Sequence, residues 1–137
     1  MSVVDEPEFQ RWRANGRAAL EGARAQRDAG VHQWACFNCE QGAQLALKGL
    51  LHGIGAAPWG HDLLDLARKA NDAGLKIPDR IDESLRRLDR YYIQTRYPDA
   101  YASGEVGTRY REDESAEAIA DAEGVLAWVD QTWESMQ

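Results

Sequence analysis

This sequence of 137 residues has little of several features that define specialised protein classes. It has two cysteines, Cys36 and Cys39, which are too few for the disulfide framework of a small secreted domain. It has no run of about 18 apolar residues, so we expect no membrane-spanning helix. Its first residues, Met1 to Glu6, lack the basic start and the apolar stretch of a signal peptide. These absences predict a cytoplasmic protein that makes no use of a membrane.

Soft metal ligands are also scarce. Apart from the Cys-x-x-Cys pair, the chain has three histidines, which are His32, His52 and His61. A structural zinc site needs about four ligands, and the sequence has no second Cys-x-x-Cys. A redox role for the pair would need a βαβ context that the sequence lacks. We therefore predict no metal site, and we interpret Cys36 and Cys39 as small buried residues one helical turn apart.

Positive charge is in deficit overall, because the formal net charge is −7. General nucleic-acid-binding proteins carry a basic excess that neutralises phosphates, so this class is disfavoured. The charge is nevertheless uneven. Residues 80–111 contain seven arginines against five acidic residues, whereas the chain from Glu112 onward has eight acidic residues and no lysine or arginine. Any polyanion would therefore meet the protein at residues 80–111.

Few strand-like alternations and only four prolines favour helices. Apolar residues recur at helical spacing in five segments, which we expect at about 7–29, 32–53, 61–74, 78–96 and from 112 onward. The second segment is apolar on more than one face, which is typical of the central helix of a bundle. In the fourth segment, Ile81, Leu85, Leu88 and Tyr92 form the predicted buried stripe. The sequence thus predicts one all-α domain over residues 1–137, an up-and-down bundle of four long helices plus one short helix.

Two short stretches carry side chains suited to binding or catalysis. His61 and Asp62 precede the third predicted helix, where one of them could cap it. Arg96-Tyr97-Pro98-Asp99 lies where Pro98 should end the fourth helix, and it is followed by Tyr101 and Arg109. Arginine and tyrosine together suit phosphate recognition and base stacking. The alternative is a structural turn, with Asp99 paired to Arg96 or Arg109.

Three motifs, taken together and in this order, resemble the HEPN (higher eukaryote and prokaryote nucleotide-binding) domain family. Residues 37–48 resemble the family's core helix, which reads close to F-H-A-Q-Q-A-A-E-K-A-L-K, with departures at Gln44 and Leu45. Residues 61–63 are similar to its H-D/S-L motif, and residues 96–99 to its R-Y-P-D turn. The resemblance covers the chain from about Arg17 to Val129.

The resemblance implies a helical bundle that forms a homodimer and acts beside a minimal nucleotidyltransferase in a toxin–antitoxin system. The first function it implies is a non-catalytic module that binds a nucleotide, this partner protein, or both. No other cofactor is expected. The binding residues that we predict are Lys48, His61, Arg96, Asp99, Tyr101 and Arg109.

The second function implied by the resemblance is a metal-independent ribonuclease toxin that cleaves RNA. Such members carry an Arg and a His in a late R-x(4–6)-H motif, which handle the phosphate and the proton. Here no histidine follows His61, and Tyr101 stands five residues after Arg96. The candidate pairs are Arg96 with His61, or Arg27 with His32, whose R-x4-H spacing spans the break between the first two predicted helices. The missing late histidine argues against an enzyme, and a purely structural dimeric module is the third alternative.

Overall fold

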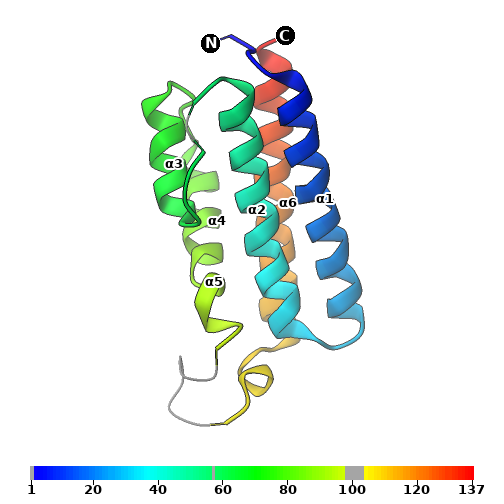
Figure 1. Ribbon diagram of the computed structural model, residues 1–137. Helices are drawn as coiled ribbons and strands as arrows, with labels where there is room; N and C mark the ends of the chain where they lie inside the picture. The colour runs from blue at the N-terminus through cyan, green and yellow to red at the C-terminus, as the bar shows by residue number, and fades with distance from the viewer. Residues whose placement is uncertain (1, 57, 98–103) are drawn as a thin grey trace.

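The computed structural model describes residues 2–56, 58–97 and 104–137, and all regular secondary structure in these ranges is helical. The elements are α1 (Glu6–Asp28), α2 (His32–Gly53), α3 (Leu63–Asp72), α4 (Asp79–Asp89), α5 (Tyr91–Gln94), the 3₁₀ helix η2 (Val106–Arg109) and α6 (Glu112–Ser135). Helices α1, α2 and α6 lie side by side, and α3, α4 and α5 lie along the other side of α2 (Figure 1). The prediction of an all-α helical bundle is confirmed.

The fourth predicted helix, residues 78–96, is divided in two. Helix α4 ends at Asp89, Arg90 forms the junction, and α5 is a single turn that ends at Gln94. Two carbonyl groups of this last turn accept hydrogen bonds from side chains instead of from the helix backbone. Thr95 Oγ1 donates to the Tyr91 carbonyl, and Arg96 Nε donates to the Tyr92 carbonyl. In the part of the chain that the structure describes, the long helices are therefore α1, α2 and α6, and not the four that were predicted, while α3 and α4 have 10 and 11 residues.

Helix α2 is the central helix, as predicted. Gly16 of α1 and Gly42 of α2 bring the two backbones together, since a Cβ on Gly42 would lie 3.2 Å from the Gly16 carbonyl oxygen. Cys36 and Cys39 are free and fully buried, and burial raises the pKa of the Cys36 thiol to about 12. The described residues contain no cluster of three or more metal-ligating side chains. The two cysteines are thus packing residues of the core.

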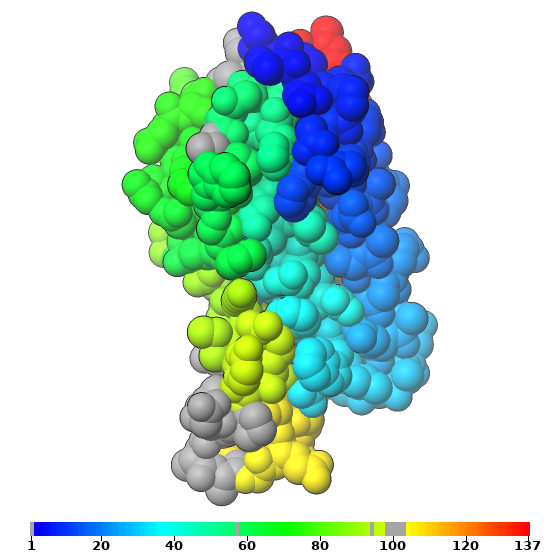
Figure 2. All heavy atoms as spheres, viewed as in Figure 1, coloured from blue at the N-terminus to red at the C-terminus, as the bar shows by residue number. Residues whose placement is uncertain are grey.

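One stripe of α2 remains partly uncovered. It is lined by side chains at helical spacing, and Trp34 at its start is 39% exposed. The other members are Phe37, Gln41, Leu45 and Lys48. In the space-filling view, atoms of α2 are visible between those of α1 and those of α3 (Figure 2). The bundle therefore leaves part of its central helix accessible.

The first and last helices pack against each other. Arg13 of α1 forms a bidentate ion pair with Asp130 of α6, and Arg24 Nη2 lies 2.9 Å from Glu123 Oε2. The chain ends lie at the same end of the bundle (Figure 1), where the Gln137 amide donates to Glu6 Oε1 over 3.1 Å. Across residues 2–56, 58–97 and 104–137, no helix combines the length and the apolar character needed to cross a membrane.

Candidate functional site

The start of α3 places His61 on the surface of α2. Asp62 caps the helix, because its Oδ1 accepts from the backbone N–H groups of Leu64 and Asp65 over 2.8 and 3.3 Å. Asp89 of α4 accepts a hydrogen bond from the backbone N–H of Leu63, the first residue of α3, over 3.2 Å. Of the two residues predicted to cap this helix, Asp62 does so. His61 lies one residue before the cap and is left to interact elsewhere.

His61 meets side chains from two other elements. Its Nδ1 lies 3.3 Å from Gln44 Oε1 and 3.5 Å from Lys48 Nζ, both on α2. Its ring centroid lies 5.7 Å from that of Tyr92 on α5, with the ring planes tilted by 30°. His61, in the loop before α3, thus contacts both α2 and α5.

Arg96 lies among aromatic rings. Its guanidinium carbon is 4.7, 4.5 and 5.0 Å from the ring centroids of Phe37, Tyr92 and Tyr97, which favours a cation–π interaction with each. Its Nε donates to the Tyr92 carbonyl over 2.8 Å. Most other arginines of the described ranges pair with carboxylates, but Arg96 has no such partner within these ranges. The terminal guanidinium nitrogens are therefore well placed to bind an anion.

We call Lys48, His61, Tyr92 and Arg96 the Tyr92 face. It unites three of the six predicted binding residues, and it adds Tyr92, which the sequence placed in the buried stripe. Tyr91 takes that buried position instead, with 2% exposure, while Tyr92 is only half-buried. Of the remaining predicted residues, Asp99 and Tyr101 lie outside the described residues. Arg109 lies in η2, which packs beside α2.

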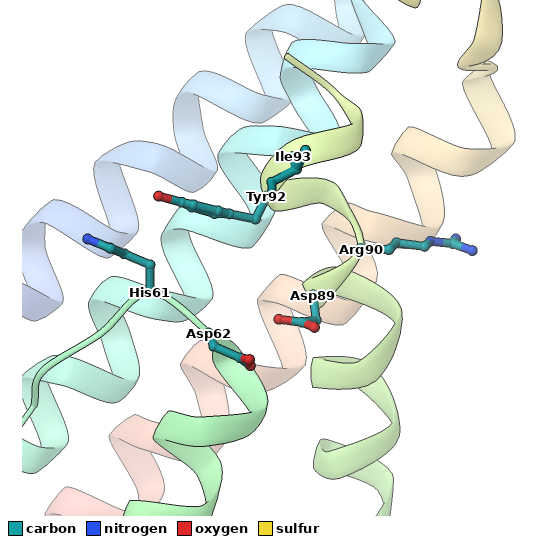
Figure 3. Close-up of a pocket in the computed structure, with 6 residues that line it drawn as sticks. All are labelled: His61, Asp62, Asp89, Arg90, Tyr92 and Ile93. Carbon is teal, nitrogen blue, oxygen red and sulfur yellow. The ribbon is translucent and has the colours of Figure 1, made fainter. Parts of the chain in front are cut away.

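A pocket of about 510 Å³ adjoins the Tyr92 face. His61 and Tyr92 form one side of it, and the carboxylates of Asp62 and Asp89 lie near each other between α3 and α4 (Figure 3). Burial and the neighbouring Asp62 raise the pKa of the Asp89 carboxyl. Arg90 extends in the opposite direction from His61 and Tyr92 (Figure 3). The pocket thus offers an aromatic wall on one side and two hydrogen-bond acceptors on the other.

Arg90 also lines this pocket, but its guanidinium extends away from His61 and Tyr92 toward partners of its own. Its guanidinium lies 4.8 Å from the Tyr91 ring centroid, and its Nη2 donates to the Tyr91 hydroxyl over 2.7 Å. Glu117 of α6 lies 3.7 Å from the same nitrogen. Lys48 and Arg96 are therefore the cations best placed to act on the Tyr92 face.

A buried carboxyl group lies behind this face. Glu40 of α2 is fully buried, and it accepts from Gln44 Nε2 over 2.6 Å and from Gln41 Nε2 over 2.8 Å. Burial raises the pKa of Glu40 to about 7, although both hydrogen bonds act in the opposite direction. Burial also lowers the pKa of the Lys48 ammonium, and the Glu40 charge opposes this shift. Sequence reasoning missed Glu40, because an acidic residue on a mostly buried helix is the only signal and its partners depend on the fold.

The alternative pair, Arg27 and His32, lies at the turn between α1 and α2. Arg27 Nη2 is 3.3 Å from Glu112 Oε1, and His32 Nδ1 is 2.8 Å from Ser115 Oγ. Arg27 and His32 therefore each have a partner near the start of α6. These contacts give Arg27 and His32 a clear structural role in fixing the start of α6 against the turn.

Fold and site together define a helical bundle with a cationic and aromatic face, to which α2, the loop before α3 and the segment around α5 each contribute side chains. The sequence profile of the HEPN domain matches residues 9–132. The chain belongs to the HEPN domain family, which confirms the predicted resemblance.

Solved structures of similar proteins agree with this assignment. The protein TT1696 from Thermus thermophilus is 36% identical, with a TM-score of 0.87 over 90% of this chain and 97% of that one. The archaeal HEPN homologue ST0689 is 31% identical, with a TM-score of 0.76 over 90% and 95% of the two chains. A HEPN domain protein of Thermotoga maritima, tm0613, is 24% identical and shares the fold, with a TM-score of 0.73 over 90% and 98%. No curated protein matches the chain.

Proposed function

We propose that this protein is a non-catalytic HEPN module that binds a nucleotide on the Tyr92 face. The observation that supports this function is that His61 and Arg96 both lie against the Tyr92 ring, with Lys48 beside His61. Arginine and lysine suit phosphate oxygens, and an aromatic ring suits stacking of a base. The adjoining pocket of about 510 Å³ has the volume of a small-molecule site.

The arrangement of Arg96 adds to this proposal. Three aromatic rings and the hydrogen bond from Nε to the Tyr92 carbonyl hold the guanidinium in place before any ligand arrives. A group that is already ordered loses less conformational entropy on binding than a free surface side chain. Arg96 is therefore the residue that we expect to contribute most to phosphate binding.

Calorimetric titration with ATP, ADP and AMP tests the proposal. We expect Arg96→Ala and Lys48→Ala each to weaken binding by about tenfold or more, which corresponds to about 1.4 kcal/mol. The matched control is Arg86→Ala, because Arg86 lies on α4 in an exposed ion pair with Asp82, outside the Tyr92 face. Equal losses in all three variants, or no binding by the unmodified protein, would count against nucleotide binding at this face.

We also propose that the module works with a minimal nucleotidyltransferase in a toxin–antitoxin system. The support is membership of the HEPN family together with the partnership that the resemblance implies. Co-expression with a nucleotidyltransferase encoded beside this protein should give a complex that survives affinity purification and gel filtration. Separate elution of the two proteins at micromolar concentration would remove this part of the proposal.

The partly uncovered stripe of α2 supports a homodimer. Trp34 and Phe37 present apolar surface there, their rings in an edge-to-face contact with centroids 5.9 Å apart. Aromatic side chains are enriched in protein interfaces. We expect light scattering to give twice the monomer mass at micromolar concentration and Trp34→Glu to shift the mass toward the monomer. A monomeric unmodified protein would contradict the dimer.

A second candidate function is RNA cleavage without a metal ion. The observation in its favour is that Arg96 and His61 both lie against the Tyr92 ring, so one chain unites an Arg and a His. Arginine would bind the scissile phosphate, and histidine would move the proton of the attacking hydroxyl. Cleavage that is lost in His61→Ala and retained in His32→Ala would favour this enzyme over the binding module. Cleavage that survives both changes would remove the histidine mechanism.

A further inference from the structure

A chain of hydrogen bonds connects the core of the bundle to the Tyr92 face. It begins at Glu40, which is 0% exposed, and passes to Gln44, which is 3% exposed and lies one turn later on α2. Gln44 Nε2 lies 2.6 Å from Glu40 Oε2, and Gln44 Oε1 lies 3.3 Å from His61 Nδ1. Gln44 is therefore the link between a buried carboxyl group and a surface imidazole.

The chemistry of these groups fixes which atom donates and which accepts in each of these hydrogen bonds. An ionised carboxylate can only accept hydrogen bonds, so Gln44 must offer its NH₂ group to Glu40. The Gln44 amide oxygen is then left to face His61, and it too can only accept. Nδ1 of His61 must therefore carry the proton of this hydrogen bond. In neutral His61, Nε2 is then the nitrogen with the free lone pair.

We propose that Glu40 is a positioning residue that fixes His61 in its Nδ1–H tautomer by orienting the Gln44 amide. The consequence for binding rests on the proposed nucleotide function. Neutral His61 would accept a hydrogen bond at Nε2 from a hydroxyl or amino group of the ligand. Nothing in the described ranges forms a hydrogen bond with this nitrogen, so it is available for that contact.

The same assignment separates the tasks of His61 and Lys48. Lys48 Nζ lies 3.5 Å from His61 Nδ1, at the limit of a hydrogen bond. A protonated Nδ1 cannot accept from an ammonium group, because both groups are donors. The hydrogens of Lys48 therefore stay available for an anion such as a phosphate, while His61 offers an acceptor.

The tautomer can be measured directly in the ligand-free protein. Long-range ¹H–¹⁵N correlation spectra of ¹⁵N-histidine-labelled protein distinguish a protonated ring nitrogen from one with a free lone pair. We expect Nδ1–H for His61 at pH 8, where Glu40 is mostly ionised. Substitutions at His32 and His52 assign the signals. A His61 found as the Nε2–H tautomer in the unmodified protein would overturn the proposal without any variant.

Three variants of α2 test the role of Glu40 itself. In Glu40→Gln no group forces the Gln44 amide into one orientation, so we expect the His61 signals to move toward the Nε2–H tautomer. The reciprocal exchange, Glu40→Gln with Gln44→Glu, places a carboxylate beside His61 and should restore Nδ1–H. Gln41→Ala is the matched control, because Gln41 also donates a hydrogen bond to Glu40, whereas the hydrogen-bond distances of His61 in the described ranges are to Gln44 and Lys48. Unchanged His61 signals in Glu40→Gln would overturn the proposal.

These spectra also distinguish this proposal from the proposed function. If His61 has the expected tautomer but ATP, ADP and AMP do not bind, then nucleotide binding fails and the role of Glu40 stands. If the nucleotides bind and Glu40→Gln leaves the tautomer unchanged, then the role of Glu40 fails and nucleotide binding stands.

Discussion

Replacing Glu40 with glutamine should make the free energy of unfolding less dependent on pH. The part of this free energy that Glu40 contributes, and that the variant lacks, should fall by about 3 kcal/mol between about pH 4.5 and pH 7. The cause is the complete burial of this carboxyl group, which raises its pKa from 4.5 to about 7 in the folded protein. In this range the folded state holds the proton more tightly than the unfolded state. The contribution of Glu40 to stability is therefore present in full below pH 4.5 and is lost as the pH rises through 7.

Urea unfolding at a series of pH values from 4 to 8 measures this effect. The difference in unfolding free energy between Glu40→Gln and the unmodified protein should rise with pH, in favour of the variant, and level off above about pH 7. Glu123→Gln is a suitable control, because Glu123 is half exposed and lies in a surface ion pair with Arg24. Parallel pH profiles for the unmodified protein and Glu40→Gln would show that Glu40 is ionised with little penalty.

Replacing Gly53 with alanine should lower the free energy of unfolding by about 2 kcal/mol. Gly53 is the last residue of α2, and a Cβ there would lie 2.6 Å from Trp133 Cη2 and 3.1 Å from Phe9 Cβ. The indole cannot easily move aside, because it is 3% exposed and stacks on Phe9 with ring centroids 4.0 Å apart. The strain from overpacking should exceed the helix propensity gained with alanine, which is roughly 1 kcal/mol.

The control for this prediction is Gly124→Ala in α6. Apart from the adjoining backbone of α6 itself, no atom lies within 4 Å of a Cβ at this position, so alanine should raise stability by up to about 1 kcal/mol. A smaller side chain at position 133 should relieve the strain, and Gly53→Ala should therefore cost less in a Trp133→Leu background than in the unmodified protein. A Gly53→Ala variant as stable as the unmodified protein would contradict the predicted clash.

The sequence predicted the central helix more accurately than the one that bears Tyr92. Residues 32–53 form α2 as expected, because Gly53, Gly55 and Pro58 give a clear stop. Residues 78–96 keep a helical apolar spacing through the break at Arg90, so periodicity could not reveal it. The hydrogen bonds of Thr95 and Arg96 to backbone carbonyls, which end α5, arise only in the folded chain.

The candidate site was predictable where a motif marked it. Lys48, His61 and Arg96 are predicted from three separate motifs, and the fold brings His61 and Arg96 to the Tyr92 ring and Lys48 next to His61. Glu40 could not be identified in this way, since its role depends on the orientation of Gln44 and on burial by neighbouring helices. Arg27 and His32 also match a motif by their spacing in the sequence, but in the folded chain they do not form a common site. Each contacts a different residue of α6.

The pairing of α1 with α6 has a consequence for the kinetics of folding. Arg13 and Asp130 are separated by 117 residues, so their contact requires closure of almost the whole chain. Such non-local contacts slow folding, because the entropy of loop closure is lost before the contact forms. Since residues 6 and 137 already touch, a short linker between the ends would make this pairing local. In a circular permutant opened at the turn around Gly30, α6 and α1 would follow each other in the sequence. They would then pair as a helical hairpin, and their contact would no longer require closure of the whole chain.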